Sequence, residues 1–462
     1  MKAPVSFRTS ALIAGDSSII VVGILTALAL RLGTLGAAYQ LEENNAASKI
    51  LLITLICLVS LYIHDLYDYK VIADRWELRL RLVQALGISW IVLAILFYLV
   101  PGWEVGRGTA LYSIAVTLLL LLVLRSGLHF LFGHPHIGER ILIVGDTQVA
   151  IDAAKAAHRR KDAGYRVVGF LTSEFSSSEH ELADARHFGR IDQLEAIVAQ
   201  EKIDSVVIGA LEHRGNLPTE ALLRLRLAGT VNIEEFTSFF ERMTGRVNLG
   251  MLRPSWLIFS GRSRDTQIKV ATREIGYRLL AFIGLVVSLP IAVLTAVLIK
   301  LESAGPCLYR QARVGKNGAI FELIKFRSMK IDAEPDGQAI WAAPDDSRAT
   351  TLGKIIRKIR VDEIPQFWNI LRGEMSFIGP RPERPQFVSA LTKQIPFYEH
   401  RHLVAPGLTG WAQIKYPYGA SVEDARHKLE YDLYYIKNQS FLLDVVILIE
   451  TIKTIIFGRG GR

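Results

Sequence analysis

The stretch that decides the fold is "YRLLAFIGLVVSLPIAVLTAVLIK", residues 277–300. A bilayer span takes about 20 apolar residues, so the stretch is long enough to cross, yet Pro290 stands in its middle with Ser288 close by. Proline removes one backbone donor and clashes with the preceding turn, so the helix must bend or break here. The carbonyl that the break frees must find another donor, either Ser288 or the surrounding protein.

Basic residues flank this stretch at both ends. They are Lys269, Arg273 and Arg278 before it and Lys300, Arg310, Arg313 and Lys316 after it. Because basic flanks favour the cytoplasmic side of a membrane, both ends are expected there. The sequence therefore predicts a re-entrant hairpin in membrane lipid at about residues 277–300. The alternative is a kinked fifth span, which would put everything after residue 300 on the other side.

The first third of the chain holds apolar runs at 11–32, 48–66, 82–101 and 109–132, each near the length of a membrane span. Half of the 462 residues are hydrophobic (50%) and only 21% are charged, which is rich for a soluble protein. The loop between the second and third runs carries several Lys and Arg, whereas the loop before it has two acids and no base. We expect a four-span transmembrane bundle over residues 1–135 with both ends in the cytoplasm, broad enough to support a homodimer.

From about residue 139 the composition becomes soluble. "RILIVGD", "YRVVGFL" and "IDSVVIGA" are strand-like, and "VAIDAAKAAHRR" (149–160) and "EALLRLRLAG" are helix-like. The alternation predicts a Rossmann-like α/β domain over residues 136–262. The turn "GDTQVA" (145–150) lacks the glycines that let a backbone approach a pyrophosphate, so intact dinucleotide binding is not expected.

Charge and cysteine count leave the partner open. A net charge of +9 suits nucleic acid, an anionic membrane or a phosphorylated substrate. Cys57 and Cys307 are too few for a disulfide framework and lack metal-ligand spacing. The placement of the charges must decide between these partners.

The segment "LGKIIRKIRVDEIPQFWN" sets two adjacent carboxylates, Asp362 and Glu363, among cations that include Arg357. It is expected to form one helix that ends at Pro365. Adjacent carboxylates raise each other's pKa while neighbouring cations oppose this, so at least one should be ionised at neutral pH. An ionised Asp can attack phosphorus or hold a metal ion.

Further cations lie in two other segments. "LIKFRSMK" offers Lys325 and Arg327, and "GPRPERP" offers Arg381 and Arg384. Arg presents a planar fork to phosphate oxygens, which phosphoryl transfer requires. Each fragment alone fits a solvated surface equally well. Their coincidence favours a phosphate site built from Lys325, Arg327, Arg357, Arg381 and Arg384, with a phosphorylated substrate and no nucleic acid.

The blocks "RVGKNGAIFELIKFRSMK", "VDEIPQFWNILRGEMSFIGPRPERP" and "YEHRHLVAPGLTGWAQI" resemble those of bacterial sugar transferases, the monotopic polyprenyl-phosphate phosphoglycosyl transferases. The resemblance covers about 270–462, and the spans and Rossmann-like module resemble the long form of the family. It implies a mainly helical monotopic catalytic domain over residues 263–462 that contains the re-entrant membrane helix hairpin. It also implies a multi-pass protein of the bacterial inner membrane, with the soluble and catalytic parts on the cytoplasmic side.

The same resemblance implies an activity and residue roles. A sugar 1-phosphate would pass from a UDP-sugar to undecaprenyl phosphate with release of UMP, the initiating step of exopolysaccharide, capsule or O-antigen synthesis. Asp362 would be the nucleophile and Glu363 its partner at a Mg²⁺ site, while Arg357 and Arg381 would hold phosphates. The family often has Ser-Pro at the hairpin break, whereas here Leu289 separates Ser288 from Pro290.

Two other classes remain open. A membrane-bound NAD-dependent nucleotide-sugar dehydratase or epimerase would also join spans to a Rossmann unit, but it should show a glycine fingerprint and Tyr-x-x-x-Lys, and none of the 15 tyrosines has lysine four residues on. The second alternative is a polysaccharide assembly scaffold. No motif specifies which sugar is transferred.

Overall fold

The computed structural model describes residues 7–42, 45–67, 75–100, 103, 106–132, 139–145, 165–171, 186–188, 193–209, 218–229, 231–252, 267–330, 333, 348–416, 419 and 421–456. The chain forms two compact units, Met1–Phe239 and Phe240–Arg462.

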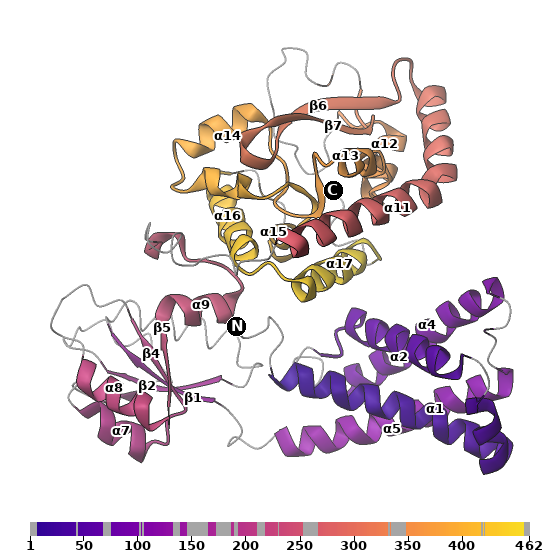
Figure 1. Ribbon diagram of the computed structural model, residues 1–462. Helices are drawn as coiled ribbons and strands as arrows, with labels where there is room; N and C mark the ends of the chain where they lie inside the picture. The colour runs from indigo at the N-terminus through magenta and orange to yellow at the C-terminus, as the bar shows by residue number, and fades with distance from the viewer. Residues whose placement is uncertain are drawn as a thin grey trace. The chain divides into compact units, whose positions relative to one another are not determined.

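Four long helices form a bundle in the first unit (Figure 1). They are α1 (Phe7–Glu42), α2 (Ala46–Ile63), α4 (Arg75–Leu99) and α5 (Arg107–Phe132). Each helix contacts two others, because α1 packs on α5 and α2, and α4 packs on α2 and α5. Ile20, Leu61, Leu82 and Leu121 meet in the buried core of the bundle. The helical backbone of α1 is interrupted at Gly33, one residue beyond the predicted apolar run.

Among the described residues, five helices are long and apolar enough to cross a membrane. These segments are Leu12–Glu42, Ala46–Ile63, Glu77–Leu99, Gly108–Arg125 and Val270–Glu302. The first four coincide with the predicted apolar runs, and the fifth contains the stretch with Pro290.

A buried ion pair joins the first and last helices of the bundle. Arg125 donates to Asp16 at 2.6 Å, and its guanidinium lies 5.3 Å from the centroid of the Tyr67 ring. Both charged side chains are almost completely buried. Charges inside an apolar bundle pair with one another because an unpaired charge there costs several kcal/mol, so this pair fixes α1 against α5.

A five-stranded parallel sheet follows in the same unit, as the alternation of strands and helices predicted. The strands are β1 (Glu139–Val144), β2 (Tyr165–Leu171), β3 (Arg186–His187), β4 (Ser205–Ile208) and β5 (Asn232–Glu235), in the order β3-β2-β1-β4-β5. The helices α7 (Leu194–Gln200) and α8 (Thr219–Ala228) connect strands, and α9 (Phe236–Thr244) follows β5. The predicted helix 149–160 lies outside the described residues, as does the turn at 145–150 apart from Gly145.

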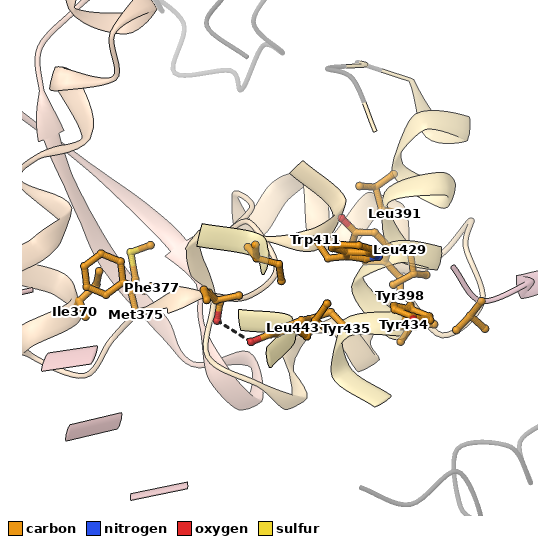
Figure 2. Close-up of a cluster of buried hydrophobic side chains, with 14 of the residues drawn as sticks. Ile370, Met375, Phe377, Leu391, Tyr398, Trp411, Leu429, Tyr434, Tyr435 and Leu443 are labelled. Atoms are coloured by element: carbon orange, nitrogen blue, oxygen red, sulfur yellow. Dashed lines mark hydrogen bonds between the residues drawn. The ribbon is translucent and has the colours of Figure 1, made fainter. Parts of the chain in front are cut away.

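The second unit is built around a large hydrophobic core (Figure 2), with a smaller buried cluster beside it. Its helices are α11 (Gln267–Glu302), α12 (Thr351–Lys358), α13 (Gln366–Leu371), α14 (Pro385–Thr392), α15 (Trp411–Lys415), α16 (Val422–Lys437) and α17 (Phe441–Ile456). Short 3-10 helices form at Leu249–Met251, Lys316–Gly318, Val361–Glu363 and Tyr398–Leu403. Its strands are the antiparallel pair β6 (Leu308–Val314) and β7 (Ile320–Phe326) and the parallel pair β8 (Ser376–Ile378) and β9 (Gly407–Thr409).

The stretch with Pro290 forms one helix, α11, that consists of two straight segments meeting at a bend (Figure 1). Ala281, before the bend, is buried in the main core, and a Cβ at Gly284 would lie 3.0 Å from the Phe367 ring of α13. Ile299, after the bend, is buried with Phe326 and Ile356 of β7 and α12. Both ends of α11 therefore pack on the same unit.

The middle of α11 is different, because apolar side chains on both sides of the bend are exposed. They include Val286, Val287, Leu289, Ile291, Val293 and Leu294. The Ser288 hydroxyl donates to the Leu285 carbonyl at 3.3 Å, one residue before the carbonyl that Pro290 leaves without its usual donor.

The last helix, α17, packs into the core through Leu443 and Ile447. Its buried Asp444 accepts hydrogen bonds from Tyr277 of α11 at 2.7 Å and from Tyr435 of α16 at 3.0 Å. Because the carboxylate has two hydroxyl donors, its burial is compensated. It thereby ties the membrane-type helix α11 to the globular core.

Candidate active site

Asp362 and Glu363 lie in the 3-10 turn between α12 and α13. The prediction of one continuous helix ending at Pro365 was wrong, since α12 ends at Lys358 and Arg360 takes a left-handed conformation with φ 56°. This conformation cannot continue a helix and redirects the chain. Asp362 thereby becomes buried against the β6–β7 side of the unit instead of lying on a solvated helix face.

Two arginines hold Glu363. Arg360 Nη1 lies 3.2 and 3.3 Å from its two carboxylate oxygens, and Arg381 Nη2 lies 3.3 Å from Oε1. Burial by itself would raise the pKa of Glu363, but the positive charges of Arg381 and Arg360 outweigh it and hold that pKa below its ordinary value. Glu363 is therefore a fixed anion at neutral pH.

Asp362 is in the opposite situation. Burial and the neighbouring Glu363 charge raise the pKa of Asp362 to about 6, against the lowering effect of Lys325, Arg357 and Arg381. Within the described part of the chain no hydrogen bond or ion pair to its carboxylate is found. Asp362 is thus mostly ionised at neutral pH but poorly stabilised, the condition that makes a carboxylate a reactive base or nucleophile.

Lys325, on β7, lies within electrostatic reach of Asp362. Burial, together with the positive charge of Arg313, lowers the pKa of Lys325 to about 8, although Asp362 opposes the shift. Its ammonium lies 5.2 Å from the centroid of the Tyr309 ring on β6. A cation held in this way can meet an incoming anion without first leaving a salt bridge.

Arg381 reaches the site from the loop after β8. The loop packs against the loop that carries β9, because no room for a Cβ remains at Gly379, Gly407 or Gly410, where each position meets backbone atoms of the opposite loop. The Arg381 side chain stays half-exposed (49%) while it contacts Glu363. Its Nη1 also lies 3.5 Å from the Oε1 of Gln413 on α15, at the outer limit of a hydrogen bond.

The structure brings together most of the residues that the sequence pointed to. Asp362, Glu363, Lys325, Arg357 and Arg381 lie within electrostatic reach of one another. Arg384 is the N-cap residue immediately before α14. Burial lowers the pKa of Arg313, and the charge of Arg384 adds to this effect.

Arg327 is turned elsewhere. Its guanidinium donates at 2.8 Å to the carbonyls of Ser303 and Ala304 and to the Ser303 hydroxyl, just beyond the end of α11. This buried arginine fastens the chain after the membrane-type helix. These hydrogen bonds give Arg327 a structural role, and its side chain makes no contact with Asp362.

Three residues near the site were missed as functional candidates. Arg313 entered the sequence argument as a basic flank and, like Arg401 and Gln413, within the blocks quoted for the family resemblance, but none of the three was given a role in the site. A signal for the first was present, because Tyr309, Gln311 and Arg313 alternate along β6 and share one face, where they form a chain of hydrogen bonds at 3.0 and 2.6 Å. Nothing local marks the other two, which depend on tertiary contacts.

A metal ion would find two carboxylates here. No group of three or more His, Cys, Asp or Glu side chains with metal-binding geometry occurs among the described residues. Mg²⁺ is usually held by one or two carboxylates together with substrate phosphates, so this is no objection. Asp362 is the better placed ligand, since Glu363 is held by two arginines. The residues fit a Mg²⁺ ion shared with a phosphorylated substrate.

Comparison with known proteins finds two family matches. Residues 269–458 match the family described as "Bacterial sugar transferase", and residues 62–223 match the family described as "CoA-binding domain". The first match covers every site residue described above.

Several characterised proteins are similar to this chain. The "UDP-N-acetylgalactosamine-undecaprenyl-phosphate N-acetylgalactosaminephosphotransferase" of Aeromonas hydrophila is 46% identical over 48% of this chain and 52% of its own length. The "Undecaprenyl-phosphate glucose phosphotransferase" of Komagataeibacter xylinus is 32% identical over 70% of this chain and 60% of its own length. The "UDP-glucose:undecaprenyl-phosphate glucose-1-phosphate transferase" of Escherichia coli (strain K12) is 30% identical over 73% of each chain. The chain thus spans between half and three quarters of these relatives.

Proposed function

The chain belongs to the bacterial sugar transferase family, and we propose that it transfers a sugar 1-phosphate from a UDP-sugar to undecaprenyl phosphate, with release of UMP. The observation that carries the proposal is the pKa of Asp362, raised to about 6 in a site lined by cations. A carboxylate that is ionised yet poorly stabilised, next to groups that bind phosphate, suits attack on a diphosphate.

The reaction would proceed in two displacements. In the first, a carboxylate oxygen of Asp362 attacks the phosphorus that bears the sugar, and the bond from that phosphorus to the bridging oxygen breaks, so UMP leaves with the electron pair. In the second, a phosphate oxygen of undecaprenyl phosphate attacks the same phosphorus and the bond to Asp362 breaks, which restores the carboxylate. The product is undecaprenyl-diphosphate-sugar, and the two steps predict ping-pong kinetics.

The surrounding residues would each have a distinct part. Lys325, Arg357 and Arg381 bind the non-bridging phosphate oxygens, where charge develops in the transition state. Glu363 holds Arg381 in place through the 3.3 Å contact. Mg²⁺, held by Asp362 with Glu363 beside it, would neutralise phosphate charge when it is bound.

We further propose that α11 is a re-entrant membrane helix. Its two ends pack on one unit, whereas the apolar side chains around the bend are exposed, with Val287 72% exposed. Exposed apolar surface of this extent is costly in water and favourable in lipid. The helix would dip into the cytoplasmic leaflet and return, so that one site meets UDP-sugar from water and the polyprenyl phosphate from lipid.

The rest of the molecule is assigned accordingly. We propose a four-span bundle over residues 1–135, a Rossmann-like domain that begins at residue 136 and a catalytic domain that ends at residue 462, with the soluble parts in the cytoplasm of a bacterial inner membrane. The packing of residues 240–252 on the second unit supports a boundary between the last two domains near residue 240 instead of the expected 262/263. The four long apolar helices support this topology, as do the Lys and Arg residues between the second and third apolar runs, at residues 67–81. The bundle could also support a homodimer.

The test is UMP release. Membranes containing the protein are incubated with undecaprenyl phosphate, Mg²⁺ and a panel of UDP-sugars that includes UDP-glucose and UDP-N-acetylgalactosamine. We expect repeated release of UMP with at least one sugar, dependent on the lipid acceptor. Without acceptor, the intact protein should gain the mass of one sugar phosphate.

The nucleophile is tested with Asp362→Asn, because a neutral amide cannot attack phosphorus. Turnover should fall by at least about 10³-fold and the covalent adduct should vanish. The neutral side chain should not lower the melting temperature, since the raised pKa shows that the folded protein disfavours the charge on Asp362. Glu322→Gln, which neutralises an exposed carboxylate on β7, is the matched control and should leave activity unchanged. An Asp362→Asn protein that still gained the sugar phosphate would refute the double displacement.

A further inference from the structure

The loop that carries Arg381 is held through its carbonyl oxygens. Pro380 and Pro382 have no N–H groups, so the main chain here offers almost only acceptors. Each carbonyl from residue 380 to residue 383 accepts a hydrogen bond. The donors are Gly407 N at 2.9 Å, Arg401 Nη2 at 3.1 Å, Arg313 Nη1 at 2.9 Å and Val314 N at 3.0 Å, in that order along the loop.

The two middle donors are guanidinium groups from distant parts of the chain. Arg313 comes from the end of β6, and Arg401 comes from the 3-10 helix that precedes β9. They bind the carbonyls of two consecutive residues, Arg381 and Pro382. Charge-assisted hydrogen bonds are roughly twice as strong as neutral ones, so the pair restrains this short segment of backbone firmly.

Both arginines are mostly buried, and both have anionic or polar partners that keep them in place. Arg401 also donates to Asp432 at 2.9 Å and to the Tyr398 hydroxyl. Arg313 also donates to Gln311 at 2.6 Å and lies 3.7 Å from Glu383. The Nη1 and Nη2 atoms of both arginines donate to protein groups, and among the described residues the Nε atom of each is buried without a hydrogen-bond partner. Burying a guanidinium is costly, and the Nη hydrogen bonds offset part of that cost, so these side chains are committed to the protein and are not available to a ligand.

We propose that Arg313 and Arg401 are positioning residues for the transfer reaction: they clamp the carbonyls of residues 381 and 382 and so aim the Arg381 guanidinium at the phosphate site beside Glu363. The inference rests on the proposed function, in which Arg381 binds phosphate. Arg381 is half-exposed, and its two side-chain contacts, to Glu363 at 3.3 Å and to Gln413 at 3.5 Å, are long, so they hold the guanidinium in place only while its backbone is fixed as well. Displacement of a phosphate-binding group by about 1 Å can cost on the order of 100-fold in rate.

Double-mutant cycles in the full-length protein test the clamp. Arg313→Lys, Arg401→Lys and Arg381→Lys are made singly, and each clamp variant is also combined with Arg381→Lys. Lysine keeps the charge but cannot serve two acceptors with a planar fork. Arg310→Lys is the matched control, because Arg310 is on the same strand, faces the other way and pairs with Glu322 at the surface.

We expect each single clamp variant to lower kcat/KM for UMP release by about 10-fold, mainly through kcat. In the Arg381→Lys background the same substitution should cost less than about 2-fold, because the residue that it positions is already impaired. Arg310→Lys should stay within about 2-fold of the parent. A substitution that only disturbed the structure would lower kcat/KM by the same factor in the parent and in the Arg381→Lys background. A smaller effect in the Arg381→Lys background therefore identifies positioning.

The proposal is refuted if the losses in kcat/KM of a clamp variant and of Arg381→Lys multiply in full in the double variant. It is also refuted if the clamp variants behave like Arg310→Lys. Gln311→Ala serves as a second variant in case a lysine variant folds poorly, because it retains both arginines and removes only one acceptor of Arg313. It should lower kcat/KM less than Arg313→Lys does, and the loss should again be smaller in the Arg381→Lys background. Failure of the proposed function looks different, because the parent itself would then release no UMP with any UDP-sugar.

Discussion

Asp362 and Glu363 are adjacent in the chain, yet their pKa values move in opposite directions. Arg360 and Arg381 lie against the Glu363 carboxylate and lower its pKa, whereas Asp362 is buried beside that anion and its pKa rises to about 6. Such a separation assigns different tasks to two like groups. In the proposed reaction, Glu363 is the permanent anion that holds cations, and Asp362 is the group that reacts.

The rate should therefore depend on pH within a narrow range. Asp362 must be ionised to attack, so kcat/KM should fall as the pH drops through about 6, some two pH units above the range expected for an ordinary Asp. Lys325 must be protonated to bind phosphate, so kcat/KM should fall again as the pH rises through about 8. A bell-shaped profile of UMP release measured from pH 5 to pH 9.5 is the expected result.

Two variants separate the limbs of this profile. Lys325→Arg replaces the lysine with a cation that keeps its proton, so the fall at high pH should move upward while the acidic limb stays in place. Glu363→Gln removes the negative charge that helps to raise the pKa of Asp362, so the acidic limb should move to lower pH in whatever activity remains. An acidic limb near pH 4 in the parent would contradict the raised pKa.

At the scale of elements, α11 combines two roles. Its ends belong to the hydrophobic interior of the catalytic unit, through Ala281 and Ile299, while its middle presents apolar side chains outward. A straight helix of 36 residues would extend about 54 Å and could not return both ends to one domain. In the re-entrant arrangement that we propose, the bend at Pro290 determines which side of the membrane receives the active site.

Replacement of the proline should straighten the helix. We expect Pro290→Leu to favour a spanning helix and to lower UMP release at least 10-fold. In a fraction of the molecules, a tag at the C-terminus should then lie on the other side of the membrane. Tag accessibility in intact and permeabilised spheroplasts gives the measurement. Ser288→Ala is the control, because the hydroxyl bonds to the Leu285 carbonyl and should matter little to the bend. An unchanged topology and rate in Pro290→Leu would show that packing of the two ends alone specifies the bend.

At the scale of the molecule, the catalytic unit begins earlier than the family match at residue 269. Residues from Phe240 onward belong to it, with Val247 in its core and the Trp411 indole donating to the Gly245 carbonyl at 2.7 Å. Glu241 also pairs with Lys437 of α16 at 2.8 Å. The segment 240–252 therefore packs on α15, the helix that carries Gln413, and on α16.

Two truncated proteins test this boundary. A protein that starts at residue 236 should be more stable than one that starts at residue 263 by about 3 kcal/mol, from the burial of Val247 and the hydrogen bond that Trp411 would otherwise lose. Thermal unfolding in the same detergent gives the comparison, with UMP release as the readout of the site. Equal melting temperatures would show that residues 240–252 contribute nothing to the catalytic unit.

The sequence by itself determined the features that depend on local pattern. Runs of apolar residues predicted the long helices, period-two and period-3.6 patterns predicted the parallel α/β part, and Pro290 marked the bend, because each signal lies within one or two turns of chain. The candidate residues Asp362, Glu363, Lys325, Arg357 and Arg381 could be found in the same way, as charges clustered in short motifs.

Only the tertiary structure decided what each charge does. Arg327 has the same motif context as Lys325, yet it fastens the end of α11, whereas Arg313 and Arg401 hold the loop of Arg381. The left-handed Arg360 buried Asp362 where the pattern indicated a continuous helix. The physical reason is that a pKa and a hydrogen-bond partner depend on burial and on charges brought from distant segments, and no local pattern records those distances.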